Sequence, residues 1–367
     1  GQKMDLRPLT KSQPVDQDKF EVSKILFGAL PFGGVYDEIE KSSPFEAVSR
    51  ALELGINAFD TSPYYGDSEQ ILGSVLSSLS DKYPRSHYYI ITKVGRYGLN
   101  KQDFDYSPKR ARESVEESRR RLKTDYLDVV YAHDVEFVDI DEVVGDCGVL
   151  IELFKLKKEG KIKYVGISVS IQINHNPPAI LANIYILGYP LDILLKIATI
   201  QYERNQPLDI VQSYSHYCLQ NTLLSNHIPK FKSFGVKYLM NASPLSMGLL
   251  TETGPPQWHP APAKLRSVIS KCASYAKENG FNISKLAIQF SLEWDGTDST
   301  VIGLSNRKQV EEAIAWFNEV LARKRGEKNA DMIERIIVQE IQKIMGDWLN
   351  WCWESPPTTI SSTTNHK

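Results

Sequence analysis

Short apolar runs alternate with longer segments of helical periodicity along most of the chain. The runs are rich in Ile, Val, Leu, Phe and Tyr, as is typical of parallel strands that are buried on both faces. They predict eight strands: Lys24–Phe27, Ala58–Asp60, Tyr88–Thr92, Leu127–Ala132, Tyr164–Ile167, Asp209–Ser213, Tyr238–Ala242 and Thr300–Ile302. Eight β/α units are the number that closes a (β/α)8 TIM barrel of the α/β class.

The boundaries of the helical segments support this pattern. Ser-Pro pairs begin two of the segments and glycines end three of them, which are ordinary start and stop signals. The predicted helices with such signals are Ser43–Leu54, Ser107–Lys123, Val143–Glu159 and Thr222–Phe234, and a further helix, Lys308–Lys324, follows the last strand.

An open, doubly wound sheet is the structural alternative. That fold normally carries a GxGxxG turn after its first strand. Here the turn reads Gly28-Ala29-Leu30-Pro31-Phe32-Gly33-Gly34. The closed barrel is therefore the better prediction.

The pattern divides the chain into four parts. Residues 1–19 are an N-terminal extension, residues 20–326 are the barrel, and residues 327–354 are a C-terminal helical extension. Residues 355–367 are rich in Pro, Ser and Thr, and we expect them to be disordered. Three tryptophans of the extension are expected to dock it on the barrel rather than to bind substrate: Trp348, Trp351 and Trp353.

Composition and charge narrow the class of protein. A net charge of −2, with 24% charged and 42% hydrophobic residues, predicts a soluble globular protein without a basic face for nucleic acid. The most apolar stretch, Ala179–Leu191, is too short for a membrane span, and the start of the chain lacks an apolar signal core. The four cysteines lack CxxC spacing, so no metal site or disulfide framework is expected. We expect a cytoplasmic protein, and the sequence leaves its oligomeric state open.

Polar side chains stand at the ends of three consecutive predicted strands. Asp60 ends the second strand, Lys93 the third and His133 the fourth. Tyr65 follows in the loop after Asp60. The carboxyl ends of barrel strands meet at one rim, where barrel enzymes place their chemistry. We therefore expect these four side chains to lie together.

These residue types suit proton transfer between a carbonyl and an alcohol. The pKa of a Tyr hydroxyl is about 10 in water, which is too high for efficient transfer at neutral pH. A nearby Lys ammonium lowers that pKa, an Asp holds the Lys, and a His orients the substrate oxygen. Hydride must be exchanged with a cofactor, because no side chain carries one. A lone Asp could equally cap a helix, a lone Lys be a surface charge and a lone His be structural, so the inference rests on their joint placement.

The segments that hold these residues resemble the aldo-keto reductase family. They are Phe59-Asp60-Thr61-Ser62-Pro63-Tyr64-Tyr65-Gly66, Ile91-Thr92-Lys93 and Asp128-Val129-Val130-Tyr131-Ala132-His133-Asp134, and the resemblance covers Lys24 to about Phe317. It implies a nicotinamide-dependent oxidoreductase with Tyr65 as the general acid or base. It further implies that Lys93 and Asp60 tune this tyrosine, and that His133 positions the substrate oxygen.

The resemblance also implies a cofactor site on the later strands. Ser168 and Gln212 would hold the nicotinamide carboxamide, and Ser243 and Leu245 would run under the pyrophosphate. Gly303, Gln309 and Glu312 would lie at the adenosine end. Two positions depart from the family. Val169 stands where Asn or Gly is usual, and Ala242 replaces the Tyr that stacks on the nicotinamide in many members.

The adenosine end favours NAD over NADP. A 2′-phosphate prefers cations around it. Members of the family that prefer NADP commonly carry Lys and Arg at the positions of Gly303 and Gln309, which are uncharged here. NADP remains the alternative, because Arg307 and Lys308 lie close by in the sequence and could compensate.

Three further segments resemble one branch of the family, which contains D-arabinose 1-dehydrogenase and L-galactose dehydrogenase. The segments are Tyr214–Tyr217, Ala242–Leu250 and Gly254–Pro260. This branch oxidises an aldose at C1 to its lactone, so the expected partner is a small sugar or aldehyde. Trp258, His259 and His216 are the candidate substrate contacts. Packing of the loop by Trp258 and a backbone contact of His216 are equally good interpretations.

Two other functions remain open. One is the reduction of aldehydes in general with NADPH. The other is a cofactor-binding regulatory role, like that of the channel-associated β subunits of the family. The complete set of four residues argues for turnover, and the branch-like segments argue more strongly against the regulatory role.

A segment after the fifth strand departs from the short turn that the family has there. Residues 169–187 show little pattern, and their deletion leaves Gly166-Ile167-Ser168-Gly188-Tyr189-Pro190, which resembles the branch. One hypothesis is that an unspliced intron encodes the segment, since its nineteen residues preserve the reading frame. The alternative is a genuine loop at the catalytic rim, which we expect to weaken cofactor binding.

Overall fold

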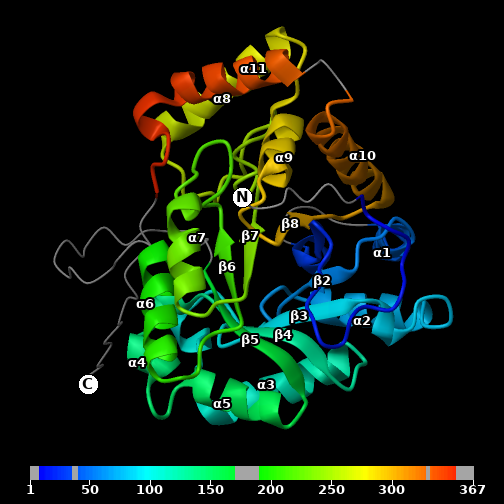
Figure 1. Ribbon diagram of the computed structural model, residues 1–367, viewed down its shortest axis with the longest axis vertical. Coiled ribbons are helices and arrows are strands. Elements are labelled where there is room, and N and C mark those ends of the chain that lie inside the picture. The colour runs from blue at the N-terminus through cyan, green and yellow to red at the C-terminus, as the bar shows by residue number, and fades with distance from the viewer. Residues whose placement is uncertain (1–7, 35–39, 170–189, 328–330, 353–367) are drawn as a thin grey trace, which may run out of the picture.

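The computed structural model describes residues 8–34, 40–169, 190–327 and 331–352. Its strands form one closed barrel of parallel neighbours in chain order (Figure 1). The strands are β1 (Ile25–Gly28), β2 (Ala58–Asp60), β3 (Tyr89–Val94), β4 (Leu127–Ala132), β5 (Ile162–Ser168), β6 (Ile210–Tyr214), β7 (Tyr238–Ala242) and β8 (Ser299–Gly303). The predicted (β/α)8 architecture is confirmed.

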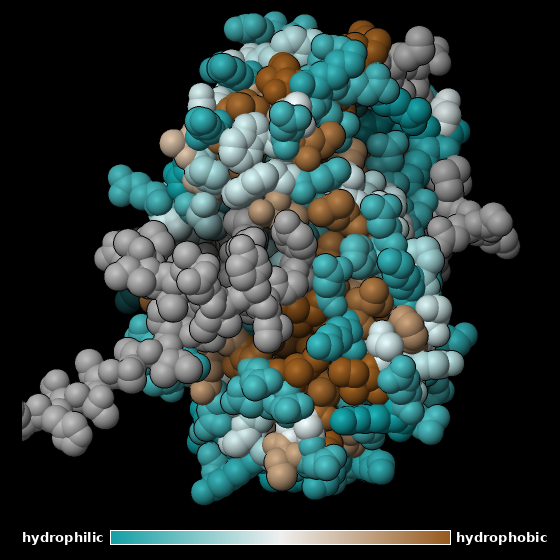
Figure 2. Space-filling view, turned by 90° about the vertical axis from the view of Figure 1, so that its left-hand side faces the viewer, coloured by the Kyte–Doolittle hydropathy of each residue, from teal (hydrophilic) through white to brown (hydrophobic). Residues whose placement is uncertain are grey.

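Helices surround the barrel and connect its strands (Figure 1). They are α1 (Ser43–Glu53), α2 (Ser68–Ser78), α3 (Pro108–Arg121), α4 (Ile140–Val144), α5 (Val149–Lys158), α6 (Pro190–Glu203), α7 (Leu224–Ser233), α8 (Ala263–Glu278), α9 (Ile283–Glu293), α10 (Arg307–Lys324) and α11 (Asp331–Met345). Apolar side chains such as Leu52, Leu72 and Val115 fill the layer between helices and strands. Figure 2 shows the side of α6 and α7, where hydrophilic atoms cover most of the periphery and hydrophobic atoms gather in a central hollow.

The register of the strands brings their polar ends to one rim. Gly28 pairs with Asp60 on one side and with Gly303 on the other. Ser168 pairs with Gln212 across β5 and β6. Parallel strands run in one direction, so these residues lie together at the carboxyl end of the barrel. That end is where barrel enzymes carry their active sites.

Phe20 closes the opposite end of the barrel. Its ring lies 4.6 Å from the ring of Tyr89, 5.4 Å from that of Tyr164 and 5.2 Å from that of Tyr238, measured between centroids. These tyrosines belong to three alternate strands. The Phe20 ring therefore packs against β3, β5 and β7 at the end of the barrel that holds no predicted catalytic residue.

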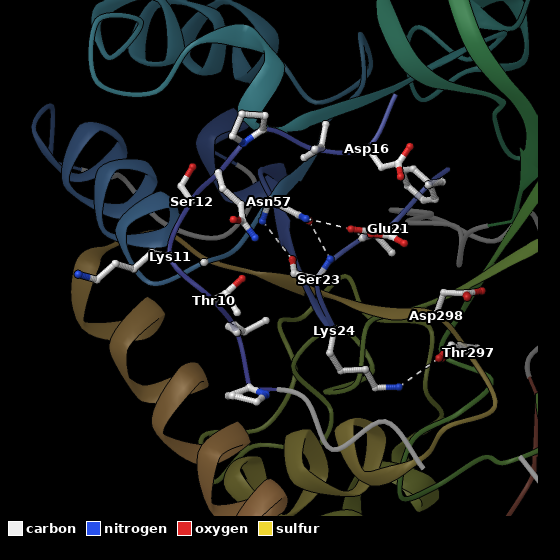
Figure 3. Close-up of a pocket in the computed structure, with 18 of the residues that line it drawn as sticks. Thr10, Lys11, Ser12, Asp16, Glu21, Ser23, Lys24, Asn57, Thr297 and Asp298 are labelled. Carbon is white, nitrogen blue, oxygen red and sulfur yellow. Dashed lines mark hydrogen bonds between the residues drawn. The ribbon is translucent and has the colours of Figure 1, made fainter. Parts of the chain in front are cut away.

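A groove of about 660 Å³ lies at this closed end, bordered by residues 8–16 (Figure 3). Its polar groups bond mainly to one another. The Ser23 amide donates to Asn57 Oδ1 at 2.7 Å, and Lys24 Nζ donates to the Thr297 carbonyl at 3.1 Å. In barrels of this type the amino-terminal end serves stability. The bonds in the groove fit that role.

The C-terminal helix packs on an additional helix rather than directly on the strands. Ile337, Ile341 and Met345 of α11 share an apolar cluster with Leu265 and Ile269 of α8, and the two helices lie side by side in Figure 1. Trp348 and Trp351 are partly buried in the same cluster. Trp353, the expected disordered tail and residues 170–187 of the inserted segment lie outside the described residues.

One predicted helix is wrong in extent. The sequence pattern predicts a single helix over Val143–Glu159, but α4 ends at Val144 and α5 begins at Val149. The Gly145 amide donates to the Asp141 carbonyl at 2.8 Å and closes α4. Gly145 and Gly148 then lie in the break, because glycine is poorly suited to a helix interior.

Within the described ranges, no helix combines the length and the apolar character that a membrane crossing requires.

Candidate active site

The four predicted catalytic side chains meet at the rim of the barrel. Lys93 Nζ donates to Asp60 Oδ1 at 2.8 Å, and it lies 4.8 Å from the centroid of the Tyr65 ring. The ring of His133 stands 5.9 Å from that of Tyr65 at an angle of 86°. All four are buried, and Tyr65, with an exposed fraction of 8%, is the least so.

Burial sets the charges of this group. It raises the pKa of Asp60 above its usual value, and the Lys93 ammonium opposes that shift. Burial also lowers the pKa of His133 well below its usual value, and Lys93 and Arg96 add to the effect. His133 is therefore neutral at physiological pH. A neutral imidazole carries one N–H donor and can orient a carbonyl or hydroxyl oxygen without being a general acid itself.

A cavity of about 300 Å³ begins beside Asp60 and follows the rim across β6, β7 and β8. Six of the predicted residues line it: Asp60, Gln212, Ser243, Leu245, Gly303 and Gln309. The absence of a side chain on Gly303 matters here. A Cβ at that position would stand 3.4 Å from Pro31, which narrows the same cavity.

Two buried polar atoms match the chemistry of a carboxamide, one on Gln212, which lines this cavity, and one on its strand neighbour Ser168. Ser168 Oγ and Gln212 Oε1 find no hydrogen-bond partner among the described residues, although both side chains are almost fully buried. Such orphaned atoms are rare in folded proteins because each costs free energy. A nicotinamide carboxamide offers both an N–H donor and a C=O acceptor. These residues therefore fit the cofactor that the sequence resemblance implies.

The adenosine end of the site is polar, and its cations are paired. Arg307 Nε lies 2.8 Å from Glu311 Oε1, and Lys308 Nζ lies 3.8 Å from Glu312 Oε1. Gln309 Oε1 accepts hydrogen bonds from the amide and the hydroxyl of Ser305. Glu312 does not line the cavity within the described residues, so its predicted cofactor contact stays a prediction.

The three candidate sugar contacts are placed differently. His259 is buried, and its ring bonds the Ser246 carbonyl at 2.7 Å and accepts from the Ala261 amide at 3.0 Å. His216 is buried, and its Nδ1 lies 2.8 Å from Ser213 Oγ. Both ring nitrogens of His259 thus bond to protein groups, while the contact of His216 involves Nδ1 alone. A substrate contact of either histidine stays a prediction. Trp258 is partly exposed, and its substrate contact stays a prediction.

Three polar residues at the site were missed by the sequence reasoning: Tyr64, Arg96 and Asp134. Arg96 Nη1 donates to Asp134 Oδ2 at 2.6 Å, and its Nη2 donates to the Tyr64 hydroxyl at 3.3 Å. Asp134 Oδ1 lies 3.3 Å from His133 Nε2. Arg96 and Asp134 lie two residues beyond the ends of β3 and β4, so the strand-end rule, extended by two residues, would have selected them.

The chain matches the Aldo/keto reductase family over residues 24–331. The closed barrel, the polar group at its rim and the family match over most of the chain together define the class of protein. The chain belongs to the aldo-keto reductase family.

Within that family it is similar to two sugar dehydrogenases. It is 39% identical to an L-galactose dehydrogenase of Arabidopsis thaliana, over 86% of this chain and 91% of that protein. It is 35% identical to a D-arabinose 1-dehydrogenase of Saccharomyces cerevisiae, over 92% of this chain and 95% of that protein. The predicted branch of the family is confirmed.

A solved structure from Pseudomonas aeruginosa, described as an aldo-keto reductase, shares the fold. It aligns with a TM-score of 0.57 at 21% identity, over 84% of this chain and 96% of that one.

Proposed function

We propose that the protein oxidises an aldose of the D-arabinose or L-galactose type at C1 to its lactone, with NAD as the hydride acceptor. The observation that carries this proposal is the buried Tyr65–Lys93–Asp60–His133 group beside a cavity with carboxamide-matching atoms. The similarity to two aldose dehydrogenases supports the choice of substrate class.

Tyr65 acts as the general base in the oxidising direction. The Lys93 ammonium favours the phenolate form because it lies 4.8 Å from the ring centroid. The phenolate removes the proton of the C1 hydroxyl while the C1–H bond breaks and the C1–O double bond forms. A nicotinamide cofactor, when bound, supplies the hydride acceptor.

The other residues of the group hold the reactants. Asp60 fixes the Lys93 ammonium at 2.8 Å, which keeps the cation next to the tyrosine. The neutral His133 orients the C1 oxygen toward Tyr65. Ser168 and Gln212 would hold the carboxamide, and their oxygens, which lack partners among the described residues, would then gain hydrogen bonds.

The preference for NAD rests on the charges of α10. Arg307 and Lys308, the cations close in the sequence to Gly303 and Gln309, are each within ion-pair distance of a glutamate. A 2′-phosphate would have to compete with these carboxylates and would be repelled by them. The 2′-hydroxyl of NAD carries no such charge.

A panel of aldoses and simple aldehydes with NAD and NADP tests the proposal, with formation or loss of the reduced cofactor as the readout. We expect kcat/KM to be highest for NAD with D-arabinose or L-galactose. A higher kcat/KM for NADPH with simple aldehydes would favour the general reductase. Tight cofactor retention without turnover of any substrate would favour the regulatory role.

A further inference from the structure

A second tyrosine–cation–aspartate group stands beside the catalytic one. The guanidinium of Arg96 lies 4.2 Å from the centroid of the Tyr64 ring, just as Lys93 Nζ lies 4.8 Å from that of Tyr65. Asp134 pairs with Arg96 as Asp60 pairs with Lys93. The two tyrosines are adjacent in sequence, and their ring centroids are 6.2 Å apart.

The surroundings of Arg96 hold this second group rigidly. Arg96 and Asp134 have exposed fractions of 1% and 0%. The Arg96 Nε donates to the Gly98 carbonyl at 3.1 Å, and the guanidinium also lies near the rings of Phe104, at 5.0 Å, and Phe137, at 5.5 Å. Although burial disfavours its charge, Asp134 raises the pKa of Arg96 above its usual value.

Tyr64 lies within reach of a substrate. Its ring centroid is 6.1 Å from that of His133, and its side chain is only partly buried. The ring of Tyr64 is thus a direct neighbour of both Tyr65 and His133.

The Tyr64 hydroxyl is prepared as a hydrogen-bond donor. A guanidinium carries no acceptor, so the Tyr64 oxygen accepts in its bond with Arg96 and the phenolic hydrogen is left for another acceptor. Burial raises the pKa of Tyr64, and Arg96 opposes the shift only in part. The hydroxyl therefore keeps its hydrogen at neutral pH.

We propose that Tyr64 binds the substrate by donating a hydrogen bond to the hydroxyl group on the carbon next to the reacting carbon. Arg96 and Asp134 are positioning residues that hold Tyr64 in place. This inference rests on the proposed function, because it assumes that a carbonyl or C1 hydroxyl reacts at Tyr65. It adds a requirement for a neighbouring hydroxyl, which distinguishes sugars from simple aldehydes.

The test compares two aldehydes that differ only in that hydroxyl, lactaldehyde and propanal, each reduced with NADH. A neutral hydrogen bond contributes about 1 kcal/mol, or roughly fivefold, and a bond whose donor is held in place contributes more. We expect the wild-type protein to prefer lactaldehyde in kcat/KM by at least about tenfold. We expect Tyr64→Phe to lower kcat/KM for lactaldehyde about tenfold more than for propanal.

Two further variants test whether the preference for lactaldehyde depends on the bond between Arg96 and Tyr64. Arg96→Lys retains a cation for Asp134 but loses the arm that bonds Tyr64, so the preference for lactaldehyde should fall in this variant also. Tyr97→Phe is the matched control. Tyr97 also lies under an arginine, with Arg110 at 4.1 Å from its ring centroid, but its hydroxyl accepts from the Gly95 amide away from the four catalytic residues. The preference should persist in the control.

An equal loss on both aldehydes in Tyr64→Phe would overturn the inference, because Tyr64 would then act only through the catalytic group. The absence of any loss on either aldehyde in Tyr64→Phe would overturn the inference as well. If the wild-type protein oxidises no aldose but shows the expected preference for lactaldehyde, the proposed function fails and the role of Tyr64 is supported.

Discussion

The ammonium of Lys93 and the carboxylate of Asp60 form an ion pair of 2.8 Å whose side chains are exposed by only 1% and 4%. A buried pair of this kind adds little net stability, because desolvation offsets the attraction between the charges. Loss of one partner, however, leaves the other charge buried and uncompensated. The pair is therefore better explained by the task of holding a cation beside Tyr65 than by stability.

Variants of Lys93 and Asp60 should show that the effect of this ion pair on stability is independent of its effect on activity. We expect Lys93→Met to lower the free energy of unfolding by about 3 kcal/mol, since Asp60 is left without its cation. The double variant Lys93→Met/Asp60→Asn should recover much of this loss and remain inactive. Urea unfolding and kcat/KM check both statements. A double variant as active as the wild type would show that the pair has no role in turnover.

The orphaned hydroxyl of Ser168 predicts opposite effects on stability and on binding. Ser168→Ala removes a buried polar atom that has no partner among the described residues, so the cofactor-free protein should be as stable or up to about 1 kcal/mol more stable. The Kd for NAD should rise about fivefold to tenfold, because a hydrogen bond to the carboxamide is lost. Thermal unfolding and fluorescence titration measure the two effects.

Thr300→Val is a matched control for Ser168→Ala. The Thr300 hydroxyl is also buried on a barrel strand without a described partner. Ser168 pairs with Gln212, which lines the cavity, whereas the strand neighbours of Thr300, Ile25 and Asn241, do not line it. Its variant should change stability in the same direction and leave the Kd for NAD unaltered. A parallel rise in Kd in both variants would contradict the assignment of Ser168.

Two buried histidines predict loss of stability in acid. Burial lowers the pKa of His216 and of His259 from 6.5 to about 4. The unfolded chain therefore takes up these protons at a higher pH than the folded protein. The stability due to the two neutral rings is complete above about pH 6.5 and is lost as the pH falls toward 4, by at most about 3 kcal/mol for each.

Urea unfolding between pH 7 and pH 4 measures this effect. In His216→Asn/His259→Gln, the free energy of unfolding should depend less steeply on pH, by about two protons near pH 5. The remaining dependence of the free energy of unfolding on pH comes from other buried groups, such as His133. An unaltered slope in the double variant would contradict the prediction.

The inserted segment makes a prediction about cofactor affinity. The described part of it is Val169, which is buried and whose amide donates to the Gln212 carbonyl at 3.4 Å, next to the predicted carboxamide contact. If the segment disturbs this contact, a variant that lacks residues 169–187 should bind NAD more tightly, by tenfold or more. Titration of both forms with NAD measures the two affinities, and equal or weaker binding by the shortened form would contradict this prediction.

The intron hypothesis is tested by sequencing the transcript. A main transcript that retains the segment would contradict that hypothesis.

Much of the fold could be predicted because a barrel repeats one simple unit. Each buried strand is a short apolar run, so its position is visible without knowledge of its neighbours. Helices α2, α6, α8 and α9 were not among the predicted helices, and α8 stands apart because it packs mainly on α11 rather than on the strands. The break between α4 and α5 was missed because the apolar pattern continues across Gly145 and Gly148.

The catalytic group was predictable because strand ends converge, but the function of its neighbours was not. His216 and His259 follow strands or lie in rim loops in the sequence, yet His259 bonds protein groups at both ring nitrogens and His216 bonds Ser213 at one. Conversely, Arg96 resembles a loop cation in the sequence. Its position two residues beyond β3 makes it a candidate, and its contacts with Asp134 and Tyr64 show that it lies at the site. Side-chain direction decides these cases, and the spacing of residues does not reveal it.

The activity of Tyr65→Phe with NAD and either D-arabinose or L-galactose tests the role of Tyr65 most directly. Loss of a general base typically costs a factor of about 10² to 10⁴. We predict that kcat/KM falls by about 10³ while the Kd for NAD changes by less than about threefold. Full turnover by Tyr65→Phe would show that the Tyr65 hydroxyl does not carry the proton.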